Sequence, residues 1–301
     1  MTLSQRKLDP ILKSNKLMLM IRLFLNSIIL LLIFFVSLVQ ADSIENMPIE
    51  YTYGKDKMQA IDLYPGSSDK VLIWIHGGGW LVGDKRADRW VRRFHRHFID
   101  HQKYNVFMIG YRVGRNTAPQ AVEDVICAYQ KIETIIDNEN FSSNDIIVAG
   151  ASAGGHLALM LGLNEVKNTD PCKYNKKPKA VVNLFGITDL QKTSDYLDDN
   201  KFFTQSNYVK SWISSNDSLS DMSYSYSPVN LNTTIIPNIL TIHGTDDSWV
   251  PYNQAEILHE KLKGNHILVT IEKGGHYRFK KDQNEYIGSK IDKFLKDNYK
   301  L

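Results

Sequence analysis

The sequence predicts an α/β fold, in which a mostly parallel, doubly wound sheet of about eight strands carries an inserted cap segment. Short apolar runs alternate along the chain with helical patterns. Each run ends at a polar or glycine-rich loop, as strands that are buried on both faces usually do. Alternation of this kind is typical of one parallel sheet with helices on both faces. The chain has 301 residues, of which 43% are hydrophobic and 23% are charged, and this composition fits a globular core.

The expected elements follow from the periodicity of the apolar residues. Two antiparallel strands, in IEYTY and MQAIDLY, open the fold at residues 49–53 and 58–64. Further strands are expected at residues 70–76, 105–111, 145–150, 179–186, 238–244 and 267–273. Helices are expected at residues 87–101, 118–136, 153–163, 252–263 and 284–299.

Residues 189–229 break this rhythm. They are rich in Ser, Asn, Asp and aromatic residues and have no clear periodicity. Since a plain connection is rarely this long, we expect an inserted cap beside the functional site of a single domain that spans 42–301. Its aromatic side chains either line a substrate pocket or form a small core of the cap; they are Tyr196, Phe202, Phe203, Tyr208, Trp212, Tyr224 and Tyr226.

The first forty residues have the pattern of a targeting segment. Lys13, Lys16 and Arg22 precede an apolar run at 23–39, and the small residue Ala41 ends the segment. A basic region, an apolar region and a small-residue site describe an export signal, so we expect cleavage after Ala41 and a periplasmic or secreted protein. The alternative is an uncleaved N-terminal membrane anchor, because the run is almost long enough to span a bilayer.

The charge of the chain belongs mainly to this segment. Residues 1–41 contain five basic residues and one acidic residue, so their removal changes the net charge from +3 to −1. A body with this charge gives no support to nucleic-acid binding. Cys127 and Cys172 lie far apart and lack a CxxC spacing. Export would permit a disulfide, but Cys127 lies in an expected buried helix, so unpaired thiols are predicted.

Four motifs follow expected strands, at the strand ends where open parallel sheets bind ligands. They are HGGGW at 76–80, GASAG at 150–154, the pair Asp246-Asp247, and GGH at 274–276. Small residues crowd Ser152, although each helical glycine costs roughly 0.5–1 kcal/mol relative to alanine. The small residues have a steric explanation if Ser152 stands on a sharp, strained turn between a strand and a helix, because the segments on either side of such a turn approach each other closely.

With these motifs the chain resembles an α/β-hydrolase of the HGGG-bearing esterase group, close to hormone-sensitive-lipase-like and feruloyl-esterase-like carboxylesterases. The resemblance covers about residues 48–299, through IHGGGWLVGDK, YRV, GASAGGHLA, YSPVN and HGTDDSWVP. It implies that Ser152 is the nucleophile, His276 the general base and Asp247 the acid that orients it.

The resemblance also implies an oxyanion hole made by the backbone N–H groups of Gly78, Gly79 and Ala153. Trp80, next to these glycines, is predicted to bind substrate.

Asp247 is preferred to its neighbour Asp246 as the catalytic acid because its spacing from two neighbouring motifs matches the family pattern. The acid there stands four residues after the histidine of His-Gly and three before Val-Pro, and these are His243 and Val250-Pro251 in this chain. Asp246 is then expected to be an exposed loop charge.

These residues predict a serine hydrolase that cleaves carboxylic esters of small molecules through an acyl-enzyme, without metal or cofactor. An arylformamidase-like amide hydrolase or a small serine peptidase would use the same chemistry. An inactive hydrolase fold that serves as a binding module is the alternative of another class. His97 and His101 have the spacing of metal ligands on a helix, but no third ligand is evident, so a solvated helix face is expected there.

Overall fold

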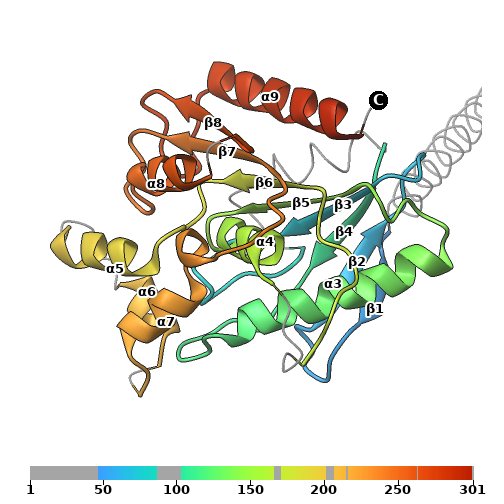
Figure 1. Cartoon of the computed structure of the whole chain (residues 1–301), viewed down its shortest axis with the longest axis horizontal. Helices are drawn as coiled ribbons and strands as arrows, with labels where there is room; N and C mark the ends of the chain where they lie inside the picture. Colours follow the sequence, from blue (N-terminus) through green and yellow to red (C-terminus); the bar gives the residue numbers. More distant parts are fainter. Residues whose placement is uncertain are drawn as a thin grey trace, which may run out of the picture. The chain divides into compact units, whose positions relative to one another are not determined.

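Eight strands form one sheet in the residues that the computed structural model describes, which are 47–86, 103–165, 171–200, 207–214, 216–262 and 264–299. The strands are β1 (Ile49–Thr52), β2 (Ala60–Tyr64), β3 (Val71–Ile75), β4 (Asn105–Ile109), β5 (Ile146–Ala151), β6 (Ala180–Leu184), β7 (Asn238–Gly244) and β8 (His266–Ile271). Their order across the sheet is β1-β2-β4-β3-β5-β6-β7-β8 (Figure 1). β2 is antiparallel to both of its neighbours, and all other neighbouring pairs are parallel. The predicted fold class is confirmed.

Helices cover both faces of this sheet. Apolar residues of α3 (Gln120–Asn138), α4 (Ala153–Leu163) and α8 (Asn253–Lys261) pack with one set of alternating strand residues. Residues of α9 (Lys281–Tyr299) pack with the other set. In Figure 1, α9 lies across the sheet from α3 and α4. The central strands β3, β4, β5 and β6 are therefore buried along their whole length, which explains why their sequences are apolar throughout.

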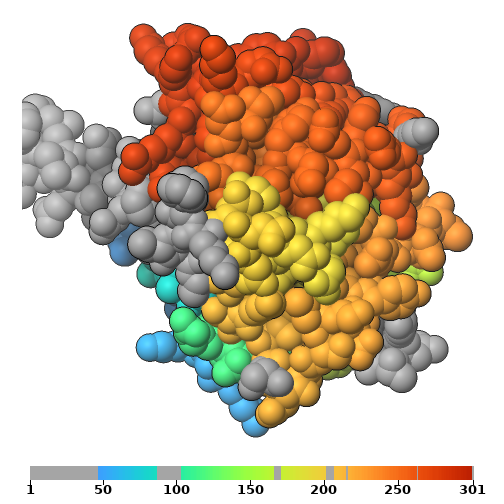
Figure 2. Space-filling view, turned by 90° about the vertical axis from the view of Figure 1, so that its left-hand side faces the viewer, coloured from blue at the N-terminus to red at the C-terminus, as the bar shows by residue number. Residues whose placement is uncertain are grey.

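Three short helices occupy the predicted cap interval between β6 and β7. They are α5 (Leu190–Asp199), α6 (Tyr208–Trp212) and α7 (Leu219–Tyr226), and a 3₁₀ turn, η1 (Pro228–Asn230), follows them. The side chains of Asp189, Asn207 and Ser218 each accept a hydrogen bond from the backbone at the start of one helix. The Ser, Asn and Asp residues that hid the periodicity thus include the N-caps of these helices. Cap segments, in yellow and light orange, lie beside the segments that follow β7 on the face shown in Figure 2.

Two predictions concern parts of the chain that lie outside the described residues. These are the export signal or anchor at 1–41 and the helix at 87–101, with His97 and His101; Phe202 and Phe203 of the cap lie outside them as well. Among the described helices, none combines the length and the apolar character needed to cross a membrane. Residues Pro48–Leu301 cluster as one compact unit.

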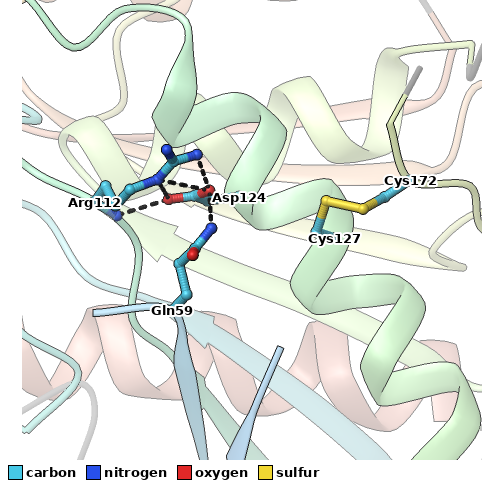
Figure 3. Close-up of a disulfide and its surroundings, with 5 residues drawn as sticks. All are labelled: Gln59, Arg112, Asp124, Cys127 and Cys172. Atoms are coloured by element: carbon cyan, nitrogen blue, oxygen red, sulfur yellow. Dashed lines mark hydrogen bonds and ion pairs between the residues drawn. A yellow bond between two sulfur atoms is a disulfide. The ribbon is translucent and has the colours of Figure 1, made fainter. Parts of the chain in front are cut away.

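The prediction of unpaired thiols is wrong, because Cys127 and Cys172 form a disulfide (Figure 3). Cys127 is only partly buried on α3, and residues 172–175, after α4, contact this helix. Tyr174 packs edge-on against Tyr129 at 5.1 Å, and the Glu133 carboxylate accepts hydrogen bonds from the backbone of the same returning segment. The 45-residue separation of the two cysteines concealed this contact in the sequence.

A second link anchors α3 to the loop after β4 and to the turn before β2. Buried Asp124 accepts hydrogen bonds from Arg112 Nη2 at 2.6 Å and from Gln59 Nε2 at 2.8 Å (Figure 3). The carboxylate also accepts from the Arg112 backbone N–H at 2.8 Å. The charge is therefore fully paired inside the fold, as a buried carboxylate requires.

Candidate active site

Ser152 stands on the turn between β5 and α4. Its backbone has φ 56° and ψ −122°, a strained combination for a residue with a side chain. The turn is held by the Ser152 N–H, which donates to the Leu184 carbonyl at 2.9 Å, and by the Ser152 carbonyl, which accepts from the His156 N–H at 3.0 Å. Ser152 directly follows β5 and is partly exposed.

The glycines around Ser152 are required by close backbone contacts. A Cβ atom on Gly150 would lie 2.2 Å from the Gly154 carbonyl oxygen, and one on Gly154 would lie 2.1 Å from the Ile75 carbonyl oxygen. A Cβ atom on Gly155 would lie 2.4 Å from Oδ1 of Asn183. The first turn of α4 therefore touches β3, β5 and β6 at distances that no larger residue permits. This accounts for the unfavourable helix composition noted above.

The loop after β3 brings bare backbone next to Ser152. A Cβ atom on Gly77 would lie 3.4 Å from Cβ of Ser152, and Gly78 and Gly79 have φ of 115° and 61°. Neither the Gly78 nor the Gly79 N–H donates to an acceptor among the described residues. Ala153 is the first residue of α4, where an N–H has no acceptor within the helix. Three amide donors are thus available around Ser152.

A buried histidine fixes the start of this loop. The His76 ring stacks on Tyr111 with centroids 4.2 Å apart, and Nδ1 lies 2.8 Å from the Gly77 carbonyl oxygen. The Tyr111 hydroxyl donates to the His76 carbonyl at 2.9 Å. Burial lowers the pKa of His76 to about 4, so the ring is neutral at pH 7 and donates from Nδ1 to Gly77.

Asp247 and His276 form a direct hydrogen bond between the loops that follow β7 and β8. Nδ1 of His276 lies 2.7 Å from Oδ2 of Asp247, while Oδ1 accepts from the N–H groups of Trp249 and Val250, both at 2.9 Å. Burial raises the pKa of the Asp247 carboxyl, but the adjacent His276 and His243 outweigh it and hold that pKa below its ordinary value. Asp247 therefore stays ionised and fixes the His276 ring with Nε2 available for proton transfer.

Asp246 has a different environment from its neighbour. It is exposed, and its backbone N–H donates to the Gly274 carbonyl at 2.9 Å. The structure thus brings Asp247, and not Asp246, to His276.

Ser152, Asp247 and His276 follow the carboxyl ends of β5, β7 and β8, respectively. The His276 ring contacts Phe185 at a centroid distance of 4.7 Å, and Phe185 directly follows the residue that accepts the Ser152 N–H. Within the described part of the chain, the Ser152 hydroxyl and the His276 ring form no hydrogen bond to each other. Such bonds often tighten only in the substrate complex.

The structure corrects the prediction that Trp80 binds substrate. Its side chain has no exposed surface; it stacks on Trp212 of α6 at 4.4 Å and meets His156 edge-on at 5.0 Å. Trp80 therefore packs the cap onto the loop after β3. His156 packs in the first turn of α4, and its Nε2 atom lies 2.7 Å from the Tyr226 carbonyl oxygen.

Two aromatic residues lie at the site: Tyr208, one of the cap aromatics expected to line a pocket or to form a cap core, and Trp249, which was not predicted. Tyr208 of α6 lies against Gly79: a Cβ atom on Gly79 would lie 3.5 Å from the Tyr208 ring. The Tyr208 hydroxyl donates to the Trp249 carbonyl at 2.9 Å. The Trp249 ring in turn stacks on His276 at 6.1 Å. Trp249 stands within the HGTDDSWVP motif, which was the available signal. For Tyr208 the sequence left open whether it lines a pocket or packs the cap, because its contacts depend on how the cap folds.

The described residues contain no cluster of three or more His, Cys, Asp or Glu side chains that could hold a metal ion. The site consists of a strained serine, Ser152, a hydrogen-bonded carboxylate and imidazole, Asp247 and His276, and a group of backbone N–H donors. Such a set can carry out acyl transfer by a serine nucleophile.

The fold and the site together define the class of the protein as α/β hydrolase. The features that do so are the sheet order, the serine on the turn between β5 and α4, and the loops after β7 and β8 that carry Asp247 and His276. The BD-FAE family model matches residues 61–262, more than half of the chain, and the protein belongs to this family. The match includes Ser152 and Asp247 and ends before His276.

Several known proteins are similar. Esterase LipC of Mycobacterium tuberculosis is 29% identical over 229 residues, which are 70% of this chain and 54% of LipC. A kynurenine formamidase of Scheffersomyces stipitis is 26% identical over 190 residues, covering 52% of this chain and 66% of that enzyme. The propionate-bound esterase Est2 of Thermogutta terrifontis superposes with a TM-score of 0.64 at 18% identity, covering 84% of this chain and 95% of Est2, and so shares the fold. The chain spans about half the length of the first two curated relatives.

Proposed function

We propose that the protein is a serine carboxylesterase, with Ser152 as nucleophile, His276 as general base and Asp247 as the orienting acid. The observation that carries the proposal is the 2.7 Å hydrogen bond between His276 and buried Asp247, at the sheet edge where Ser152 is held at φ 56°. A serine hydroxyl becomes nucleophilic when a neutral imidazole takes its proton, and the carboxylate stabilises the imidazolium that forms.

The reaction then proceeds in two halves. The Ser152 proton passes to Nε2 of His276 while Oγ bonds to the ester carbonyl carbon. The carbonyl oxygen becomes an anion that the N–H groups of Gly78, Gly79 and Ala153 receive. When this intermediate collapses, the bond to the alcohol oxygen breaks and the alcohol leaves with the proton from His276. A water molecule, deprotonated by His276, attacks the acyl-enzyme in the same way and releases the acid.

The backbone donors stabilise charge that appears only during the reaction. One oxyanion donor contributes about 3–4 kcal/mol to transition-state stabilisation in comparable sites. Because Ala153 begins α4, the partial positive charge at the start of that helix adds to the effect.

The names of the relatives support ester hydrolysis, since LipC and a second mycobacterial relative, LipM, are described as an esterase and a probable carboxylic ester hydrolase. The kynurenine formamidase relative favours amide hydrolysis as the second candidate. Parallel assays with p-nitrophenyl acetate, N-formylkynurenine and aminoacyl anilides would separate the ester, formamide and peptidase activities.

The test of the nucleophile is Ser152→Ala. We expect this variant to fold, to lose at least about 10⁴-fold in ester turnover, and to lose labelling by a fluorophosphonate probe. Retained labelling in Ser152→Ala would refute the assignment, and a wild-type protein that is not labelled would favour the inactive binding module.

Export is also part of the proposal, with residues 1–41 as the signal. The disulfide between Cys127 and Cys172 supports it, because disulfides form and persist in oxidising compartments. Mass spectrometry of exported protein should find Asp42 at the N-terminus. Full-length protein that only detergent extracts would instead favour the membrane anchor.

A further inference from the structure

His243 lies beside the Asp247 carboxylate, near the same oxygen that contacts His276. It stands near the end of β7 and has no exposed surface. Its Nε2 atom is 2.9 Å from the Val250 carbonyl oxygen and 3.3 Å from Oδ2 of Asp247. Two imidazole rings therefore face the same carboxylate oxygen, and only His276 has a place in the mechanism above.

The surroundings of His243 determine which nitrogen carries its hydrogen. Nε2 faces two acceptors, the Val250 carbonyl and the Asp247 carboxylate, so it must be protonated. Nδ1 is buried and has no hydrogen-bond partner among the described residues. A second proton there would be buried without an acceptor, which is costly. The ring is therefore neutral, with hydrogen on Nε2.

In this tautomer His243 completes the set of donors around Asp247. Oδ1 accepts from the N–H groups of Trp249 and Val250, and Oδ2 accepts from His276. The Nε2–H group of His243 faces two acceptors: the Val250 carbonyl oxygen and Oδ2 of Asp247. Val250 lies in the loop after β7, three residues beyond Asp247. The same group thus closes the loop between residues 243 and 250 and limits the rotation of the carboxylate.

We propose that His243 is a positioning residue for the hydrolase reaction: it fixes the rotamer of Asp247 and moderates the charge that Asp247 presents to His276. This inference rests on the proposed function, because it concerns the same carboxylate–imidazole pair.

Among the described residues, the titratable groups near this pair include exposed Asp246 and several tyrosines, of which Tyr277 meets the His276 ring edge-on at 6.0 Å. Tyr252 of the acid loop meets His243 edge-on at 5.8 Å. Tyr196 and Tyr208 of the cap lie near enough to sense the Asp247 charge; burial, and secondarily this charge, raises the pKa of both. Tyr196 and Tyr208 thus stay neutral around pH 7, so any change in the pH profile on altering His243 is expected to come from His276.

The experiment compares His243→Leu with His243→Gln. Leucine removes the donor, whereas the Gln side-chain amide can place an N–H near the position of Nε2. In His243→Leu we expect kcat to fall roughly 10- to 100-fold with KM within about threefold, since the loss is one hydrogen bond to a charged group. Without the donor the carboxylate attracts the imidazolium more strongly, so the acidic limb of kcat/KM should move to higher pH by about 0.5–1 unit. His243→Gln should restore both values to near those of the wild type.

The matched control is His266→Leu on the neighbouring strand β8. His266 is also buried and bonds through Nε2 to Thr241 Oγ1 at 2.7 Å. This variant should lose stability without a change in the pH profile. A folded His243→Leu with the wild-type kcat and pH limb would overturn the inference, and so would a His243→Gln variant that behaves like His243→Leu.

A second measurement needs neither substrate nor mutation. Nitrogen-15 NMR of the histidine rings in the wild-type protein should show His243 protonated at Nε2 and unprotonated at Nδ1. The opposite tautomer would overturn the inference even if His243→Leu fails to fold. If the wild-type protein hydrolyses no ester, the proposed function fails, whereas NMR still decides the state of His243.

Discussion

Asp246 and Asp247 are adjacent in one loop, but their carboxylates have different surroundings. Asp247 is buried and bonded to His276, Trp249 and Val250. Asp246 is exposed, and its side chain accepts only a 3.3 Å hydrogen bond from Thr245 Oγ1 within the described residues. A carboxylate in such an exposed position contributes little to stability or to chemistry at a neighbouring site.

Isosteric variants of this pair should therefore differ strongly. Asp247→Asn keeps the shape but leaves the wrong His276 tautomer, so kcat should fall about 10³–10⁴-fold. Asp246→Asn, the matched control, should change kcat by less than about tenfold. Steady-state kinetics on one chromogenic ester decides between them, and the reverse order would place the catalytic acid one residue earlier.

At the scale of single residues, the sequence predicted best where a motif sets the chemistry. The phase of Asp247 between His243 and Val250, and the small residues around Ser152, both correspond to contacts in the structure. Trp80 was misassigned because its neighbour in sequence lies at the site while its ring points into the core. The HGGGW motif predicted where the backbone of Trp80 lies, but it carried no information on the direction of the Trp80 side chain.

At the scale of elements, residue spacing predicted the sheet and its main helices closely. α4 has the predicted bounds, and α3 is displaced by two residues at each end. The cap helices α6 and α7 were missed because they have only five and eight residues, too few to show a helical period. The disulfide was missed because it depends on where the chain returns after α4, which sequence spacing does not show.

Within the cap, α6 holds the two loops of the site together. Tyr208 touches Gly79 of the loop after β3 and bonds to Trp249 of the acid loop. Tyr208→Phe removes only the hydroxyl and leaves the Trp249 carbonyl without this donor. We expect unfolding to become easier by about 0.5–1.5 kcal/mol, and kcat to fall severalfold. Urea denaturation and steady-state kinetics measure the two effects.

Tyr224 of α7 provides the control, since it belongs to the same cap but is 75% exposed. Tyr224→Phe should change neither stability nor kcat. Equal effects of the two substitutions would mean that the Tyr208–Trp249 contact has no special role.

At the scale of the whole molecule, three buried histidines couple stability to pH. Burial lowers the pKa of His76, His156 and His266 to about 4, and for His266 the neighbouring His259 adds to the effect. In the unfolded chain a histidine titrates near pH 6.5, so between about pH 6.5 and 4 the unfolded state binds more protons than the folded state.

The free energy of unfolding should therefore be constant above about pH 7 and decrease as the pH falls towards 4. Each histidine contributes up to about 1.4 kcal/mol per pH unit within that window. Urea denaturation at several pH values measures the slope, and His156→Gln should reduce it. A stability that is independent of pH from 7 to 4 would show that these rings are not held neutral.

The disulfide closes a loop of 45 residues between α3 and the segment after α4. Replacing both cysteines by serine should lower the free energy of unfolding by about 2–4 kcal/mol. Dithiothreitol should lower the unfolding midpoint of the wild-type protein and leave that of the double variant unchanged. Equal midpoints for the oxidised wild-type protein and the double variant would show that the bond adds no stability.

The position of α6 also sets a limit on how this scaffold can be diversified. Segments that cover an active site are attractive to exchange when a new substrate range is wanted. Here α6 is the segment least suited to exchange, because it supplies Trp212 to the Trp80 stack and Tyr208 to both loops of the site. A chimera that replaced the whole interval between β6 and β7 would exchange the segment that covers the site, but it would also lose the α6 contacts that hold the loops after β3 and β7.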